Sequence, residues 1–137
     1  NCPDAHFNLG NALKEKGDLT AAIDSFNTAL HLKPNFPDAH INLGNALQEK
    51  GDLTAVIATC NKALELIPNF PEAHFNLGNA LKEQGDLSAA IDSFNRALQL
   101  KSNFQEARSN LGAALYEQDN LTAAIAAYNT AIDSCFC

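Results

Sequence analysis

The chain has 137 residues and a formal net charge of −7, with 9 Lys and Arg against 16 Asp and Glu. Nucleic-acid-binding surfaces concentrate Lys and Arg, so this charge argues against a nucleic-acid partner. No segment approaches the roughly 18 consecutive apolar residues of a membrane span, so we expect no membrane interaction either. The chain is 46% hydrophobic but has no Trp and no Met, which is typical of thin cores between helices rich in small residues.

A segment that begins at Pro37 and ends at Leu47 recurs along the chain every 34 residues. Near copies occupy residues 3–13 and 71–81, and a more divergent copy occupies residues 105–115. A fixed internal period is the sequence signature of a repeat array, in which each unit packs against its neighbours. We therefore predict one array over residues 1–137, with repeats at 3–36, 37–70, 71–104 and 105–137.

Each repeat predicts two helices joined by a tight turn. The first helix begins at a proline, whose missing N–H costs nothing in the first turn, and ends before a glycine that closes it in left-handed backbone. The aspartate after that glycine is a good N-cap for the second helix. These pairs are Gly17-Asp18, Gly51-Asp52 and Gly85-Asp86. Asp119-Asn120 replaces them in the fourth repeat, where we expect a turn with a less favourable backbone, since Asp tolerates the left-handed region less well than Gly.

The second helix of repeat one carries apolar residues at helical spacing, at Leu19, Ala22, Ile23, Phe26, Ala29 and Leu30. The position of Phe26 holds Cys60 in repeat two, Phe94 in repeat three and Tyr128 in repeat four. We therefore predict that Cys60 is a small buried hydrophobic residue and not a reactive thiol.

Three further cysteines lie near the chain ends, at Cys2, Cys135 and Cys137. Their spacing does not provide the four ligands of a zinc site. No stretch resembles a secretion signal, so we expect a cytoplasmic location and reduced thiols.

The spacing of Leu9-Gly10, Leu13, Ala22, Phe26, Ala29 and Pro34 resembles the signature of the tetratricopeptide repeat family. The resemblance covers essentially the whole chain and departs from the family pattern mainly at the histidines His6, His40 and His74, where the family often has Trp. It implies an all-α, right-handed superhelical solenoid of four helix-turn-helix units. The first helices would line a concave groove, the second helices would form the convex back, and the protein would bind other proteins.

One asparagine position recurs in the first helix of all four repeats, as Asn8, Asn42, Asn76 and Asn110. A primary amide both donates and accepts, so it can bond to the C=O and the N–H of a bound peptide whatever side chain that peptide carries. Helices pack about 8–10 Å apart and an extended chain advances about 3.3 Å per residue, so one Asn would meet roughly every third residue of a ligand.

We predict a peptide-binding site that combines this row, a second asparagine row on the same helix face and the apolar row that precedes the first. Its predicted residues are Asn8, Asn11, Asn42, Asn45, Asn76, Asn79, Asn110, Phe7, Ile41 and Phe75. The alternative for the asparagines is a hydrogen bond to the neighbouring helix that holds the repeats in register, and both roles can coexist. The alternative for the apolar row is packing between repeats.

The asparagine ladder is similar to the repeats of the eukaryotic O-linked N-acetylglucosamine transferase family, in which ladder asparagines hold the backbone of protein substrates. This resemblance implies a peptide-groove role for the four ladder positions, but it carries no catalytic activity, since no glycosyltransferase domain is present. Repeat domains that bind the C-terminal carboxylates of chaperones need basic groups where this chain has Phe7, Glu72 and Asn76. Carboxylate rows flank the ladder, so we expect a basic or polar peptide partner in preference to an acidic one.

We recognise no nucleophile–base pair, phosphate loop or metal cluster in the sequence, so we expect neither catalysis nor a cofactor or metal. The main interpretation is a non-catalytic scaffold that holds an extended peptide. One alternative is a self-assembling module, in which the apolar last helix with Ile125, Tyr128 and Ile132 joins copies into a homo-oligomer through the C-terminal repeat. Another is a substrate-recognition part of a larger protein.

Overall fold

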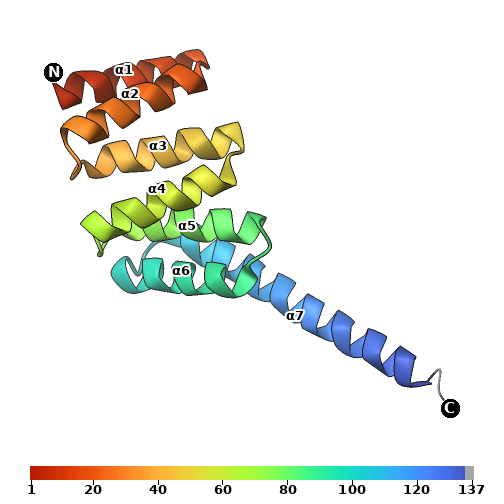
Figure 1. Cartoon of the computed structure of the whole chain (residues 1–137). Coiled ribbons are helices and arrows are strands. Elements are labelled where there is room, and N and C mark those ends of the chain that lie inside the picture. Colours follow the sequence, from red (N-terminus) through yellow and green to blue (C-terminus); the bar gives the residue numbers. More distant parts are fainter. Residues whose placement is uncertain (135–137) are drawn as a thin grey trace.

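The structure is a computed structural model that describes residues 1–134, in which three antiparallel helix pairs stack on one another and are followed by one long helix (Figure 1). Consecutive helices pack against one another, and α1, α3, α5 and α7 also contact each other in that order. The predicted all-α helical repeat solenoid is confirmed. We call the surface formed by α1, α3, α5 and the first half of α7 the first-helix face. The helices are α1 (Pro3–Lys16), α2 (Leu19–Leu32), α3 (Pro37–Lys50), α4 (Leu53–Leu66), α5 (Pro71–Glu83), α6 (Leu87–Leu100) and α7 (Gln105–Ser134).

The turns within the first three repeats follow the residues that predicted them. Gly17, Gly51 and Gly85 have φ angles of 94°, 84° and 90°, a left-handed conformation that glycine adopts without steric cost. The next residue caps the second helix: the Asp18 carboxylate accepts a hydrogen bond from the backbone N–H of Ala21 at 3.2 Å. The equivalent aspartates of repeats two and three do the same. The predicted helix pairs are confirmed for these repeats.

The fourth repeat is different, because α7 runs without a break from Gln105 to Ser134 (Figure 1). The turn that we expected at Asp119-Asn120 is wrong. No glycine stands there to take left-handed backbone, and the described residues contain no non-glycine residue with a positive φ. The segment is rich in alanine, the best helix former, so the helix continues through the position of the turn.

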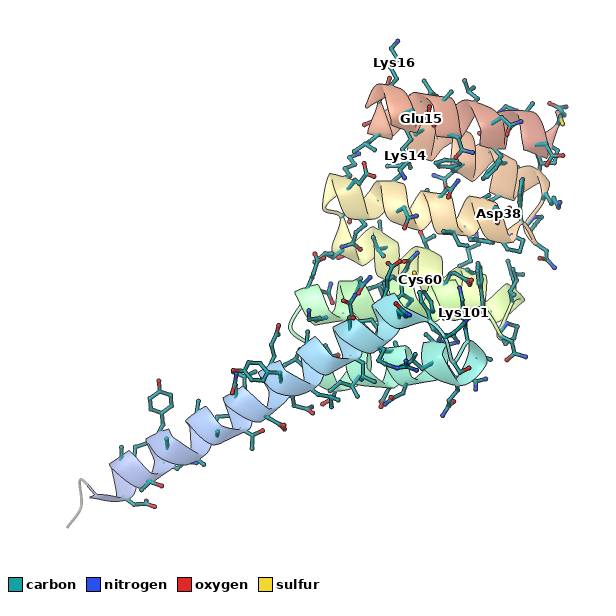
Figure 2. All side chains as sticks on the ribbon, turned by 180° about the vertical axis from the view of Figure 1, so that it is seen from behind. Lys14, Glu15, Lys16, Asp38, Cys60 and Lys101 are labelled. Atoms are coloured by element: carbon teal, nitrogen blue, oxygen red, sulfur yellow. The ribbon has the colours of Figure 1, made fainter. Side chains whose placement is uncertain are left out.

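The second half of α7 leaves the stack and has no other element beside it (Figure 2). Its large apolar side chains are therefore exposed, among them Leu121, Ile125, Tyr128 and Ile132. In the first repeat the equivalent residues Leu19, Ile23, Phe26 and Leu30 belong to the core or pack against it. The apolar stripe is thus present in the fourth repeat, but nothing in the described chain covers it.

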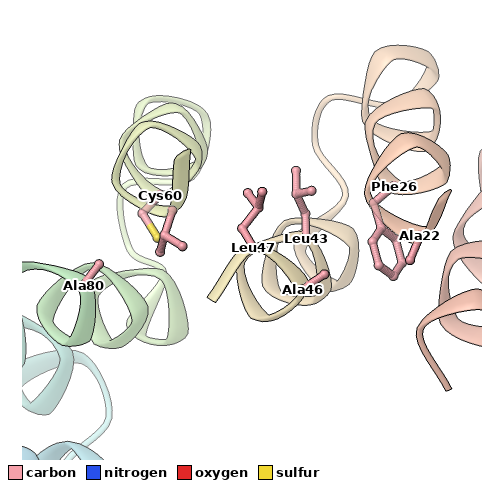
Figure 3. Packing of buried hydrophobic residues seen from close by; sticks show 8 residues of the cluster. Ala22, Phe26, Leu43, Ala46, Leu47, Cys60 and Ala80 are labelled. Carbon is pink, nitrogen blue, oxygen red and sulfur yellow. The ribbon is translucent and has the colours of Figure 1, made fainter. Parts of the chain in front are cut away.

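The largest cluster of the core extends from α2 through α3 and α4 to α5 and consists mostly of small and medium side chains (Figure 3). Phe26 and Phe94 are fully buried, and Cys60, with 4% of its surface exposed, packs with Leu43, Leu47 and Ala80. The prediction that Cys60 is a buried small hydrophobic residue is confirmed. Burial raises the pKa of its thiol to about 12, so it stays protonated and unreactive near neutral pH.

A glycine and an aromatic ring bring the two helices of repeats one and three close together. A Cβ atom added to Gly10 would lie 2.6 Å from the Phe26 ring, and one added to Gly78 would lie 2.7 Å from Phe94. The rings therefore occupy space that only glycine leaves open. At Gly112, the equivalent glycine of α7, a Cβ atom would meet nothing within 4 Å.

We predict that Gly10→Ala destabilises the protein relative to Gly112→Ala. Both changes gain the helix propensity of alanine, about 1 kcal/mol, so their difference isolates the contact with the ring. Overpacking of a filled site typically costs about 1–3 kcal/mol, and we expect the free energies of unfolding to differ by that amount. Urea denaturation followed by circular dichroism measures both. Equal stabilities would show that the ring of Phe26 does not depend on the missing Cβ.

Candidate functional site

The predicted asparagine rows lie on the first-helix face, and the structure joins two pairs of them across neighbouring repeats. The side-chain N–H of Asn42 donates to the side-chain oxygen of Asn11 at 2.7 Å. Asn110 donates to Asn79 in the same way, also at 2.7 Å. The register role that we considered for these asparagines is therefore present. Each donor still has a second N–H and its own oxygen for another partner.

The equivalent pair between repeats two and three is not joined. Asn45 and Asn76 are half-buried, and no hydrogen bond between them is formed in the described part of the chain. The Asn76 side chain instead approaches Gly44, where an added Cβ atom would lie 3.3 Å from its nitrogen. Asn8, in the first repeat, is exposed. The four asparagines Asn8, Asn42, Asn76 and Asn110 are therefore identical in sequence position, but within residues 1–134 only Asn42 and Asn110 form a hydrogen bond to the preceding repeat.

A second set of contacts ties the same helices together near their C-terminal ends. Lys14 of α1 pairs with Glu49 of α3 at 3.5 Å, and Lys82 of α5 lies 4.0 Å from Glu117 of α7. Between them, Gln48 donates to Glu83 at 2.6 Å. Our sequence analysis assigned these glutamates only to a flanking acidic row and missed their partners. The sequence does contain a signal for these contacts. Each of the first three repeats has a Lys or Gln directly before its glutamate, and this residue contacts the glutamate of the next repeat.

The three apolar residues of the predicted site are half-buried against neighbouring helices. Phe7 packs its ring on Phe36, with centroids 4.9 Å apart, and Phe75 does so on Phe104 at 4.8 Å. Ile41 packs against the small cluster around Phe70. The packing that we considered as their alternative role is therefore present in all three.

Two of the three repeated histidines, His40 and His74, link a helix to the loop before it. In the ring of His40, Nε2 lies 2.8 Å from the carbonyl oxygen of Pro34, and in His74 it lies 3.3 Å from that of Pro68. Burial lowers the pKa of both histidines. No group of three or more potential metal ligands occurs among the described residues. Cys135 and Cys137 lie outside the described residues.

Comparison with known proteins identifies the fold family. A profile described as TPR repeat matches residues 10–51, 49–85 and 78–119, and a profile described as Tetratricopeptide repeat matches residues 105–135. The chain belongs to the tetratricopeptide repeat family. The match at residues 105–135 includes all of α7, so the fourth repeat has the family's sequence pattern although residues 105–134 form one helix. A search of curated proteins found no significant match.

Solved tetratricopeptide repeat structures share the fold at low sequence identity. The first such domain of Spaghetti (RPAP3) bound to the HSP90 peptide SRMEEVD is 22% identical, with a TM-score of 0.80 over 85% of this chain and 93% of that chain. The first domain of human RPAP3, solved by NMR, is 24% identical, with a TM-score of 0.78 over 86% and 95%. The Sgt2 domain from Aspergillus fumigatus is 20% identical, with a TM-score of 0.83 over 88% and 82%.

Tetratricopeptide repeat domains are generally interaction modules without catalytic activity, and the structure of the first Spaghetti domain contains a bound peptide. None of the described helices is long and apolar enough to cross a bilayer.

We predict that the Asn11–Asn42 contact stabilises the stack while the equivalent Asn45–Asn76 pair does not. A neutral hydrogen bond contributes about 0.5–1.5 kcal/mol, so a double-mutant cycle with Asn11→Ala and Asn42→Ala should give a coupling energy of that size. The cycle with Asn45→Ala and Asn76→Ala is the matched control, and its coupling should be near zero. Urea unfolding measures both. Equal coupling in the two cycles would contradict the difference in bonding.

Proposed function

We propose that this protein is a non-catalytic interaction module that binds an extended peptide along the first-helix face. The proposal rests on one observation above all, the half-buried asparagines whose amides are oriented by a neighbouring repeat. Asn42 is fixed by its bond to Asn11, yet it retains an oxygen and an N–H. A side chain held in place loses less entropy when it binds a ligand. Asn110 repeats this arrangement two repeats further along.

The charge of the chain favours a basic or polar peptide. The structurally similar Spaghetti domain is bound to an acidic peptide, SRMEEVD. This chain has Phe7, Glu72 and Asn76 at the positions where the family resemblance places the basic groups of carboxylate-binding repeat domains. A net charge of −7 adds long-range repulsion of acidic ligands. We propose that acidic peptides bind weakly and basic or polar peptides bind more tightly.

The test is a peptide array with basic, neutral and acidic peptides, SRMEEVD included. The ladder variant changes Asn8, Asn42, Asn76 and Asn110 to Ala. The matched control changes Asn27, Asn61, Asn95 and Asn129 to Ala. These are exposed asparagines at one repeated position, on α2, α4, α6 and the second half of α7.

We expect wild type and control to bind the same basic or polar peptides. We expect the ladder variant to lose at least about tenfold in affinity, since several hydrogen bonds of about 1 kcal/mol each are removed. Circular dichroism checks that all three proteins are folded. If the ladder variant binds as wild type does, the asparagines act only in holding the repeats together.

A second candidate function, self-association through α7, is supported by one specific observation. Gly112 has nothing within 4 Å of an added Cβ, and Tyr128, the equivalent of Phe26, is 72% exposed. The two residues are 16 positions apart, about 24 Å along a straight helix, so within one α7 the ring cannot reach the glycine. The Tyr128 ring of one copy would fill the Gly112 site of another and bury apolar surface of both.

We predict that wild type associates with rising concentration in light scattering. The variant Asp119→Gly with Asn120→Asp restores the turn sequence of the other repeats, so the second half of α7 can fold back onto Gly112 of its own chain, and it should be a monomer. Asp119→Ala with Asn120→Ala keeps the helix continuous and should associate as wild type does. A wild-type monomer at millimolar concentration would rule out this function.

A further inference from the structure

A cavity of about 480 Å³ opens among α2, α3 and α4, away from the predicted peptide-binding residues, none of which lines it. This volume is within the range of small-molecule sites in proteins, about 300–1,000 Å³. Leu30, Leu43 and Leu66 provide apolar walls, one from each of the three helices. The cavity is therefore a separate candidate site.

The cavity lies beside the most loosely filled helix pair of the first three repeats. In repeat two, Cys60 stands where Phe26 and Phe94 fill the space above a glycine in repeats one and three. A Cβ atom added to Gly44 would meet no atom of α4 within 4 Å. A thiol is much smaller than a phenyl ring, so the side chain of Cys60 does not fill the space beside Gly44 between α3 and α4.

The lining of the cavity carries positive charge and no carboxylate. Lys62 lies in the wall and forms no ion pair with any described carboxylate. Ala58, also in the wall, replaces the aspartate found at the same position in repeats one and three, Asp24 and Asp92. In a chain of net charge −7 this local absence of carboxylates favours an anionic ligand.

The wall also contains the ring of His40. His40 is only 6% exposed, and its Nε2–H donates to the carbonyl oxygen of Pro34 at 2.8 Å. Its other ring nitrogen, Nδ1, is then an acceptor, and it is buried without a partner. Burial, with a smaller effect of Lys62, lowers the pKa of His40, so the ring is neutral at pH 7. Because Nδ1 has almost no accessible surface, it does not open into the cavity. The His40 ring therefore contributes an uncharged face to the wall.

We propose that the cavity binds a small apolar carboxylic acid. The carboxylate pairs with Lys62, and the apolar body lies against Leu30, Leu43 and Leu66. The site is independent of peptide binding on the first-helix face.

The probe for this site is 6-hydroxy-2-naphthoate, titrated into ¹⁵N-labelled protein and followed by NMR. Its cationic analogue, 6-(aminomethyl)-2-naphthol, keeps the ring and the hydroxyl but reverses the charge. We expect the acid to shift the amide signals of the segments that line the cavity, residues 27–34, 40–43 and 58–66, in a saturable way. The amine should bind at least about fivefold more weakly, as expected for the loss of roughly 1 kcal/mol from one ion pair.

Two variants borrow residues that other repeats have at the same positions. Lys62→Thr introduces the residue of position 28, and Ala58→Asp introduces the residue of positions 24 and 92. Each should weaken binding of the acid by about fivefold or more. The control Lys50→Thr removes an exposed lysine from the end of α3 that does not line the cavity, and it should change the affinity less than twofold.

Three results would overturn the proposal. One is the absence of saturable shifts in the cavity segments, including the case in which the probe shifts only signals of α7, whose exposed apolar side chains attract such rings. The second is equal affinity for acid and amine. The third is an equal effect of Lys62→Thr and Lys50→Thr.

Discussion

The contact between a glycine on the first helix of a repeat and an aromatic ring on the second sets how closely the two helices pack. Gly10 with Phe26 and Gly78 with Phe94 make this contact, and both rings are fully buried. Because the ring occupies the space of a missing side chain, the two helices meet at a short distance and the next helix can stack on a filled surface. Neighbouring rings extend the contact, with Phe7 packed between Phe26 and Phe36.

The repeats that lack this contact are the ones with unusual features. In repeat two the ring is replaced by Cys60, α4 does not reach Gly44, and a cavity lies beside the pair. In repeat four the ring is present as Tyr128, but the helix does not turn back, and Gly112 remains uncovered. In both repeats the missing contact coincides with space or surface that the described chain leaves unfilled, a cavity among α2, α3 and α4 in one case and exposed apolar side chains of α7 in the other.

The first-helix face depends on a different kind of contact, polar and repeated. Asn42 with Asn11 and Lys14 with Glu49 connect α1 to α3, and similar pairs connect α5 to α7. Exposed ion pairs contribute little to stability, about 0–1 kcal/mol, so their effect is mainly on the register of the helices. The half-buried amides of Asn42 and Asn110 help to fix the register of neighbouring helices, and each keeps one N–H and its oxygen available. In our proposal, this structural role is therefore compatible with peptide binding.

The sequence by itself determined the helix pairs of the first three repeats, because proline, glycine and aspartate act locally through backbone geometry and capping. It also determined that Cys60 is buried, since the apolar period places that position in the core. The continuation of α7 past Asn120 also has a local cause, the missing turn glycine, although the repeat pattern alone predicted a turn. Only the tertiary structure decided which asparagines bond and that a cavity forms beside repeat two. These features depend on the distances between helices. The period of a sequence predicts which residues share a helix face, but it does not predict which side chain of a neighbouring helix each of them contacts.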